Sequence, residues 1–201
     1  MKTINNYITE RLHITKQTSI YNYFPETKEE LREILEERLA EDKNADLNDI
    51  DVSKITDMNG LFEDLDPHNI DISGWDVSNV EDMSYMFYYC ENFNSNLSNW
   101  NVSNVTDMID MFYCCSNFNS NLSNWNVSKV TNMYCMFCVC KNFNANLSNW
   151  DVSNVKNMYH MFYGCLNFDC DLGKWNVSKV KDMYRMFKQC AIKNIPSWYK
   201  E

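Results

Sequence analysis

Hydrophobic positions recur along this chain with a period of 25 residues. The period is easiest to follow in six tryptophans, the last of which comes two residues early: Trp75, Trp100, Trp125, Trp150, Trp175 and Trp198. Residues 76–100, DVSNVEDMSYMFYYCENFNSNLSNW, and residues 101–125, NVSNVTDMIDMFYCCSNFNSNLSNW, show how closely successive units agree. About three quarters of the chain is therefore one unit, repeated.

The first half of each unit predicts a helix. Its apolar residues are spaced by 3, 3, 1 and 3 positions, which places them on one stripe of an α-helix; in the second unit they are Val80, Met83, Met86, Phe87 and Cys90. Ser78 precedes this stripe as an N-cap, and Glu81 completes a capping box. The second half, residues 91–102, has a polar turn followed by spaced apolar residues, which is typical of a short strand.

A lone unit of this kind cannot bury its apolar side, whereas a stack of units builds a continuous core. Stacked strands lie about 4.8 Å apart and packed helices need roughly 8–10 Å, so a stack with strands on one side and helices on the other must bend. We therefore predict an α/β fold: a curved solenoid with one helix and one short strand per 25-residue repeat.

The two ends of the chain depart from the repeat. Residues 26–41 predict a helix with one apolar face, opened by Thr27 and Glu30 as a capping box. We expect residues 1–50 to form an N-terminal helical cap and residues 51–201 to form six repeat units. The last unit is degenerate, and residues 190–201 are expected to close the core as a C-terminal cap.

The repeated columns V-x-x-M-x-x-M-F-x-x-C-x-x-F-N-x-x-L-S-x-W-x-V-S run from Val105 to Ser128 and again from Val130 to Ser153. They resemble the BspA-like leucine-rich-repeat surface-protein family, in its variant with repeats of about 25 residues. The resemblance covers residues 51–198 and implies a leucine-rich-repeat-type solenoid. It also implies a bacterial or phage protein that binds proteins or host surfaces.

Charge is distributed unevenly along the repeats. Residues 51–125 carry one basic and twelve acidic residues, whereas residues 126–201 carry ten basic and five acidic residues. The acidic half argues against nucleic acid as a ligand, because phosphate binding needs clustered Lys and Arg. We expect a protein partner of complementary charge, or a second copy stacked head to tail.

The beginning of the chain, MKTINNYITERLHITK, lacks the apolar run of an export signal, and no segment has the ~20 apolar residues of a membrane span. We therefore expect no membrane insertion. As written, the chain is expected to be cytoplasmic or virus-borne, and a surface or secreted location is expected if a leader has been removed.

Cysteine and histidine offer few catalytic options. Five of the nine cysteines form one column of the repeat, which predicts reduced thiols that line the core: Cys90, Cys115, Cys140, Cys165 and Cys190. Cys135 and Cys138, together with Cys140 and His160, leave open a metal or redox role, but they are expected on different helical faces. We therefore expect no cofactor, no metal and no enzymatic activity.

Two sets of variable residues are candidates for partner binding. On the predicted convex, helical face, tyrosines are dense, and tyrosine is a frequent anchor at protein interfaces; they are Tyr85, Tyr88, Tyr113, Tyr134, Tyr159, Tyr163 and Tyr184. The predicted concave, strand face is small and polar, with Ser98, Asn99, Asn101, Ser123, Asn124, Asn126, Ser148, Asn149 and Asp151.

These observations favour a non-enzymatic protein–protein interaction module that presents a repeat-built surface to a partner. Two alternatives stay open: a surface or secreted adhesin of the BspA-like type, and a cysteine-based metal or redox protein.

Overall fold

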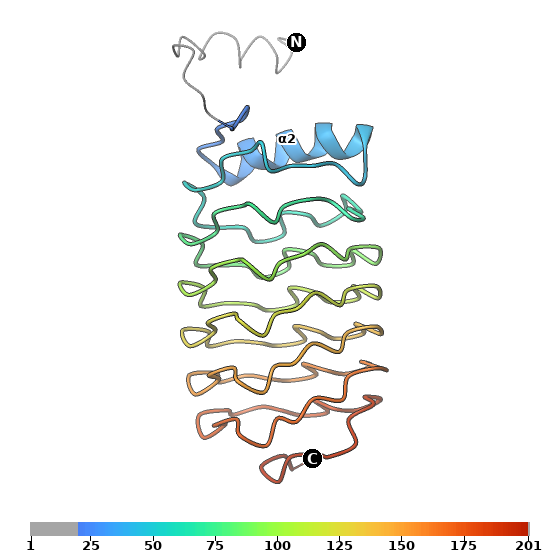
Figure 1. Cartoon of the computed structure of the whole chain (residues 1–201). Helices are drawn as coiled ribbons and strands as arrows, with labels where there is room; N and C mark the ends of the chain where they lie inside the picture. The colour runs from blue at the N-terminus through green and yellow to red at the C-terminus, as the bar shows by residue number, and fades with distance from the viewer. Residues whose placement is uncertain (1–19, 201) are drawn as a thin grey trace.

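The computed structural model describes residues 20–200, which form a column of stacked coils (Figure 1). Each coil corresponds to one repeat, and neighbouring coils are joined by backbone hydrogen bonds between residues about 25 positions apart. The amide of Phe87, for example, donates to the carbonyl of Met111 at 2.9 Å, and the amide of Phe112 donates to the carbonyl of Met136 at 3.0 Å. The stack is thus built from nearest-neighbour contacts between equivalent residues.

Helix α2, Lys28–Glu41, lies over the first coil (Figure 1). Its buried face consists of Leu31, Leu35 and Leu39, which are all within 1% of complete burial. Thr27 is the N-cap, and its hydroxyl accepts a hydrogen bond from the Glu30 amide at 3.1 Å. The Glu30 carboxylate in turn accepts from the Glu26 amide at 2.8 Å, so the helix predicted from the capping box is confirmed.

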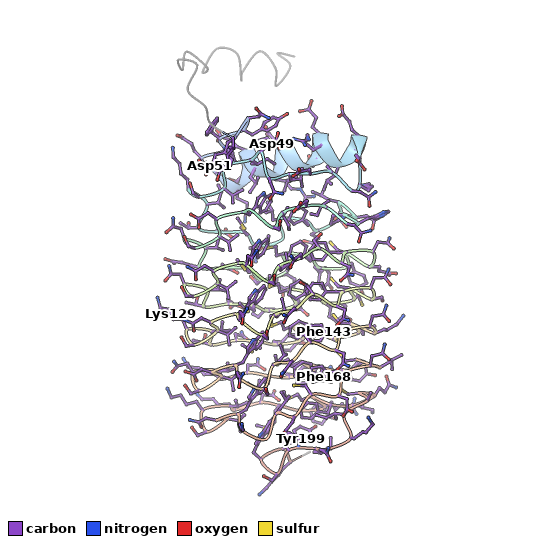
Figure 2. The ribbon with its side chains drawn as sticks, in the orientation of Figure 1. Asp49, Asp51, Lys129, Phe143, Phe168 and Tyr199 are labelled. Atoms are coloured by element: carbon purple, nitrogen blue, oxygen red, sulfur yellow. The ribbon has the colours of Figure 1, made fainter. Side chains whose placement is uncertain are left out.

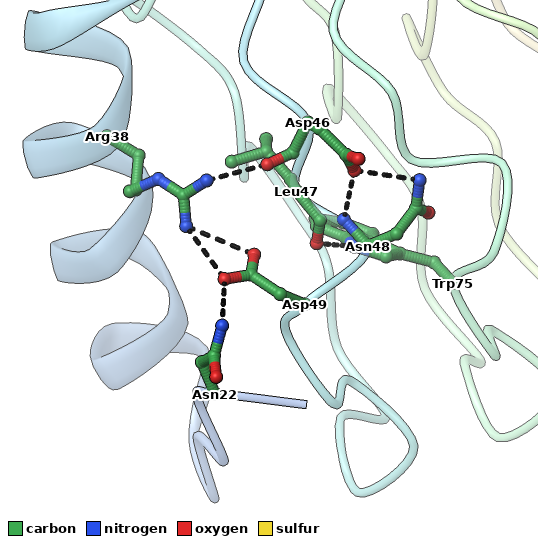
Figure 3. A network of polar contacts seen from close by, with 7 residues as sticks. All are labelled: Asn22, Arg38, Asp46, Leu47, Asn48, Asp49 and Trp75. Carbon is green, nitrogen blue, oxygen red and sulfur yellow. Dashed lines mark hydrogen bonds and ion pairs between the residues drawn. The ribbon is translucent and has the colours of Figure 1, made fainter. Parts of the chain in front are cut away.

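Polar contacts fix α2 to the chain beneath it (Figure 3). The Arg38 guanidinium pairs with the Asp49 carboxylate at 3.1 Å and donates to the Asp46 carbonyl at 2.6 Å. Asn22 donates to the same Asp49 carboxylate at 2.9 Å. The helix is therefore held on the stack by a charge-assisted network as well as by its leucines.

The repeats themselves contain neither the predicted helix nor the predicted strand. Among residues 20–200, α2 is the only α-helix, and extended pairing is limited to isolated parallel bridges such as Asp82 with Asp107. The predicted α/β fold with one helix and one strand per repeat is therefore wrong. Ser78 is correspondingly no helix cap, because its amide donates to the Asp76 carboxylate in a local turn at 3.0 Å.

The backbone of each repeat explains why the helix does not form. Two columns adopt left-handed φ angles of about 50° to 70°, which an α-helix of L-residues cannot contain; in the inner repeats they are Tyr85, Asp110, Cys135 and His160, and Tyr89, Cys114, Val139 and Gly164. Alternate amides close four-residue β-turns, as Met86 does on the Met83 carbonyl at 3.3 Å. The intervening amides donate to carbonyls of the next coil. A run of such turns buries apolar side chains at the same spacing that predicted a helix.

The predicted curvature is also not observed. The column in Figure 1 stands straight, without the bend of a horseshoe. Bending was expected because helices pack farther apart than strands, and repeats without helices have no such mismatch. The stack therefore has no convex and concave sides.

Aromatic columns fill the interior, with one phenylalanine stacked on the next along the axis (Figure 2). Phe87 and Phe112 have ring centroids 5.5 Å apart and nearly parallel planes, and Phe143 and Phe168 are 5.7 Å apart. Tryptophans form a parallel column, and each indole N–H donates to a backbone carbonyl of the preceding coil, as Trp125 does to Leu97 at 2.9 Å. The repeat thus satisfies the one polar group of its largest core residue.

Candidate interaction surface

The predicted tyrosines lie along one side of the stack because of the alternation in the turn segment. In residues 83–90, Met83, Ser84, Met86, Phe87 and Cys90 are buried, whereas the three tyrosines between them reach the surface. These three positions, together with the Ser84 position, which later coils fill with tyrosine, supply the tyrosine face, which we define as Tyr85, Tyr88, Tyr89, Tyr113, Tyr134, Tyr159, Tyr163 and Tyr184. Tyr89 was outside the main candidate set and is the most exposed of them, at 53%.

Four of these tyrosines form a first ring cluster in the N-terminal part of the face. Tyr88 contacts all three others, with centroid distances of 5.5 Å to Tyr85, 4.7 Å to Tyr89 and 5.2 Å to Tyr113. Tyr89 and Tyr113 lie 5.3 Å apart. Their mutual contacts restrict the rings before any partner binds.

A second ring cluster lies in the following coils and is organised around His160. The His160 ring stacks on Tyr159 at 4.0 Å and on Tyr163 at 4.9 Å. Tyr134 stacks on Tyr159 at 5.0 Å. The Arg185 guanidinium lies over the Tyr184 ring at 4.8 Å, which makes the C-terminal end of the face cationic.

Asp110 lies between the two clusters and is a site residue that the sequence analysis missed. Its side chain is only 6% exposed, and burial raises the pKa of its carboxyl group to about 6, although a hydrogen bond with Tyr85 acts in the opposite direction. Burial also raises the pKa of Tyr85, as does the nearby Asp110 charge. A clue was present in the sequence, because Asp110 is the one acidic residue in the column Gly60, Tyr85, Asp110, Cys135, His160 and Arg185.

His160 is placed among aromatic rings and not among metal ligands. Its Nε2 atom is buried and has no hydrogen-bond partner, and burial together with the nearby Arg185 charge lowers the pKa of its imidazole. Within the described residues, no group of three or more His, Cys, Asp or Glu side chains is arranged to hold a metal ion. Cys135 and Cys138 are buried beside the tyrosine face and carry free thiols.

The cysteine column contains free thiols that act as hydrogen-bond donors. Cys115 donates to the Phe87 carbonyl at 3.0 Å, and Cys140 donates to the Phe112 carbonyl at 2.9 Å. Burial raises the pKa of both thiols far above the usual value. The thiols of this column therefore stay protonated and donate to carbonyl groups of the preceding coil. A buried, protonated thiol is a poor nucleophile.

The second candidate set lies at turns along the stack, where several members hold the backbone. Asn101, Asn126 and Asp151 accept hydrogen bonds from the amides two residues further on, at 3.0–3.2 Å. The amides of Ser98, Ser123 and Ser148 donate to asparagines two residues earlier, at 3.0–3.1 Å. Asn99, Asn124 and Asn149 are exposed at the same corners. Most of this set is therefore occupied by turn formation.

Comparison with known families adds the following. The model of a family described as "Mycoplasma protein of unknown function, DUF285" matches residues 29–137 and again residues 114–199. The chain belongs to this family. Two overlapping matches in one chain fit a family built from tandem repeats, and they support the general resemblance to a repeat-containing surface-protein family. The specific leucine-rich-repeat type is not shown by them.

No curated protein and no solved structure matched this chain. In the described part of the chain, no helix has both the length and the apolar character needed to span a bilayer.

Proposed function

We propose that this protein is a non-enzymatic protein–protein interaction module and that the tyrosine face binds its partner. The observation that supports this most directly is the pair of ring clusters, in which eight tyrosines are gathered on one side of a stacked column and none is completely buried. Tyrosine combines a large apolar area with a polar tip and loses little conformational entropy on binding.

The preorganisation of the rings supports the same proposal. Tyr88 and Tyr159 are each held by several ring contacts, so a partner would meet a surface that is already ordered. Preordered contact residues lower the entropic cost of association. Arg185 would add a positive charge at the C-terminal end of this face.

A surface or secreted adhesin is the second candidate, because the family match supports a resemblance to repeat-containing surface proteins. It would use the same tyrosine face, with a partner outside the cell. Recovery of the native protein from a cell-surface or medium fraction would favour this alternative over an intracellular partner.

The test begins with affinity capture from lysate and from culture medium, followed by measurement of the dissociation constant with the purified partner. In the test variant Tyr88, Tyr113 and Tyr163 become serine, and we expect binding to weaken at least tenfold because the centre of the first cluster and one ring of the second are lost. The matched control changes Asn99, Asn124 and Asn149 to alanine at the turn corners. Circular dichroism and thermal unfolding must first show that both variants are folded. Loss of binding in the asparagine variant alone would reject the tyrosine face.

A further inference from the structure

The tyrosine face carries charges of opposite sign at its two ends. Glu63 lies at the N-terminal end, and Arg185 and Lys188 lie at the C-terminal end. Within residues 20–200, none of these three side chains has an ion-pair partner. Arg32 also reaches the N-terminal end, but it is already paired with Glu36 at 2.8 Å. The face is therefore acidic at one end and basic at the other.

These charges lie beside the two ring clusters. Burial raises the pKa of the Tyr88 hydroxyl group, and the nearby Glu63 charge adds to this shift. Burial lowers the pKa of the His160 imidazole, and the nearby charges of Arg185 and Lys188 act in the same direction. The first cluster is thus next to a carboxylate, and the second cluster is next to two cations.

One column of the face shows this order most clearly. It takes one residue from each coil, and the amide of each donates to the carbonyl three residues earlier, so all of them occupy the same place in their β-turns. We call this set the Tyr88 column: Glu63, Tyr88, Tyr113, Cys138, Tyr163 and Lys188. A carboxylate and an ammonium group are at the two ends, tyrosine rings lie inside them, and a small thiol lies next to the centre. The column is complementary to its own reversed copy.

Such an order fits a second copy of the chain that is turned end to end. A two-fold axis across the face, between the coil of residues 101–125 and the coil of residues 126–150, would lay each coil on the one at the same distance from the axis. The Glu63 carboxylate would then meet the Lys188 ammonium group of the second copy, and the converse pair would form at the other end. Between them, ring would lie on ring and, next to the axis, ring on thiol.

The neighbouring columns agree with this register. Arg185 would face Gly60 of the second copy, and the Glu63 carboxylate lies close to that glycine, since a Cβ added to Gly60 would be 3.3 Å from the Glu63 Oε2 atom. Tyr89, the most exposed tyrosine of the face, would lie on Gly164, which adds no side chain to the surface. The same axis therefore matches charge in one column and side-chain size in another.

Other arrangements of two copies fit less well. A parallel pair would lay each coil on its own equivalent, so that Glu63 would meet Glu63 and Lys188 would meet Lys188, and like charges repel. Head-to-tail stacking would have to displace α2, which lies over the first coil (Figure 1). Arg32 of this helix donates to the Gly60 and Leu61 carbonyls at 3.2 and 2.9 Å.

We propose that the partner of the tyrosine face is a second copy of this chain, bound antiparallel about a two-fold axis between the coils of residues 101–125 and 126–150. The proposal rests on the function proposed above, because it names the occupant of the same face. Two ion pairs between Glu63 and Lys188 close the interface at its ends, and the first ring cluster of each copy meets the second cluster of the other. Six coils span only about 24 Å along the axis, so the interface is small and the dimer is weak and reversible.

The test is sedimentation equilibrium of the full chain under reducing conditions, which exclude dimers linked through the partly exposed Cys114. Glu63→Lys and Lys188→Glu each bring like charges together at both ends, and each should weaken the dimer at least tenfold. Both changes in one chain should restore the dissociation constant to within about threefold of the original. An equimolar mixture of the two single variants should restore it as well, because each copy then offers the charge that the other needs at both ends.

Matched controls make the same charge changes outside the tyrosine face. Glu37→Lys on the exposed side of α2 and Lys174→Glu at a turn corner should leave the dimer unchanged. Circular dichroism and thermal unfolding check that every variant is folded. Recovery in the mixture cannot come from improved folding of one chain, since neither chain in it has a second substitution.

Several results would overturn the proposal: a full chain that stays monomeric at high concentration, a dimer that the charge variants leave unchanged, or a mixture that does not recover. Oligomers larger than a dimer that persist in the variant with Tyr88, Tyr113 and Tyr163 changed to serine would indicate head-to-tail stacking. That variant should lose the antiparallel dimer. If the full chain is monomeric and the serine variant still loses a captured partner, the tyrosine face binds another protein, and only the second copy is rejected as its occupant.

Discussion

At the residue scale, the left-handed backbone positions are the least expected feature of the fold. A non-glycine residue in this conformation costs roughly 1–2 kcal/mol, and β-branched residues tolerate it least. Yet Val139 has a φ of 62°, and only Gly164, one coil later, has the residue type that suits the position. The stack imposes this conformation because, along this segment, the backbone amides donate alternately to a carbonyl of their own turn and to a carbonyl of the next coil.

Substitutions in this column should therefore change stability in opposite directions. Gly164→Ala introduces a side chain at a φ of 71°, and we expect it to lower the free energy of unfolding by about 1 kcal/mol. Val139→Asn should raise it by a few tenths to about 1 kcal/mol, because asparagine tolerates this region. Urea unfolding followed by circular dichroism measures both. If Gly164→Ala raised the free energy of unfolding, the left-handed backbone at residue 164 would not be a source of strain for a residue with a side chain.

Asp110 gives a second prediction at this scale. Burial raises the pKa of the Asp110 carboxyl group in the folded protein to about 6, whereas its ordinary value in the unfolded chain is 3.8. Between pH 3.8 and about pH 6 the folded state therefore keeps a proton that the unfolded state has released. The contribution of Asp110 to stability should therefore fall as pH rises from about 4 to about 6, and stay low above that. Asp110→Asn should raise the free energy of unfolding at pH 7.5 by about 1–2 kcal/mol and change it little at pH 4.

A matched carboxylate tests the sign of this effect. Hydrogen bonds with Ser153 lower the pKa of Asp151, so Asp151 stabilises the fold above its unfolded pKa, and Asp151→Asn should be mildly destabilising at pH 7.5. Unfolding curves at both pH values separate the two cases. If both variants respond alike, the buried environment of Asp110 is not the cause.

At the element scale, the tryptophan column links each coil to the one before it. Trp125→Phe removes the indole N–H that satisfies the Leu97 carbonyl and leaves a void beside Trp100 and Trp150. We expect a loss of about 2–4 kcal/mol, from the unpaired buried carbonyl and the cavity together. Trp198→Phe makes the same change at a partly exposed end position and should cost clearly less. If thermal or urea unfolding showed the same loss of unfolding free energy for Trp125→Phe and Trp198→Phe, burial of the tryptophan would not be the cause.

The elements also show what sequence patterns could and could not predict. Helix α2 was predictable because Leu31, Leu35 and Leu39 follow the cap at Thr27 and Glu30 at intervals of four residues, which a helix places on one face. The capping-box pattern alone was not decisive, since Ser78 and Glu81 share it and form no helix. The spacing of Met83, Met86, Phe87 and Cys90 is not specific to a helix, since overlapping four-residue β-turns give the same inward stripe. Positive φ at Tyr85 and Tyr89 could not be predicted, because neither residue type marks that conformation.

At the scale of the whole molecule, the repeat period predicted that the units stack around one continuous core but not the path of the chain within each unit. Equivalent residues of neighbouring coils do lie on one another, as Phe87 does on Phe112 and Trp100 on Trp125. The tyrosine face was found for the same reason, because columns remain columns whatever their backbone. Asp110 was missed, since its role depends on how deeply its side chain is buried.

The direction of the hydrogen bonds between coils also bears on how the protein would respond to force. These bonds run along the axis, so tension between the two ends of the column loads them coil by coil and not all at once. A coil of 25 residues that opens would release roughly 85 Å of chain, in exchange for about 5 Å of stacked length. A short, stiff column could in this way become a long tether in equal steps, giving way first where the fewest neighbours hold a coil in place.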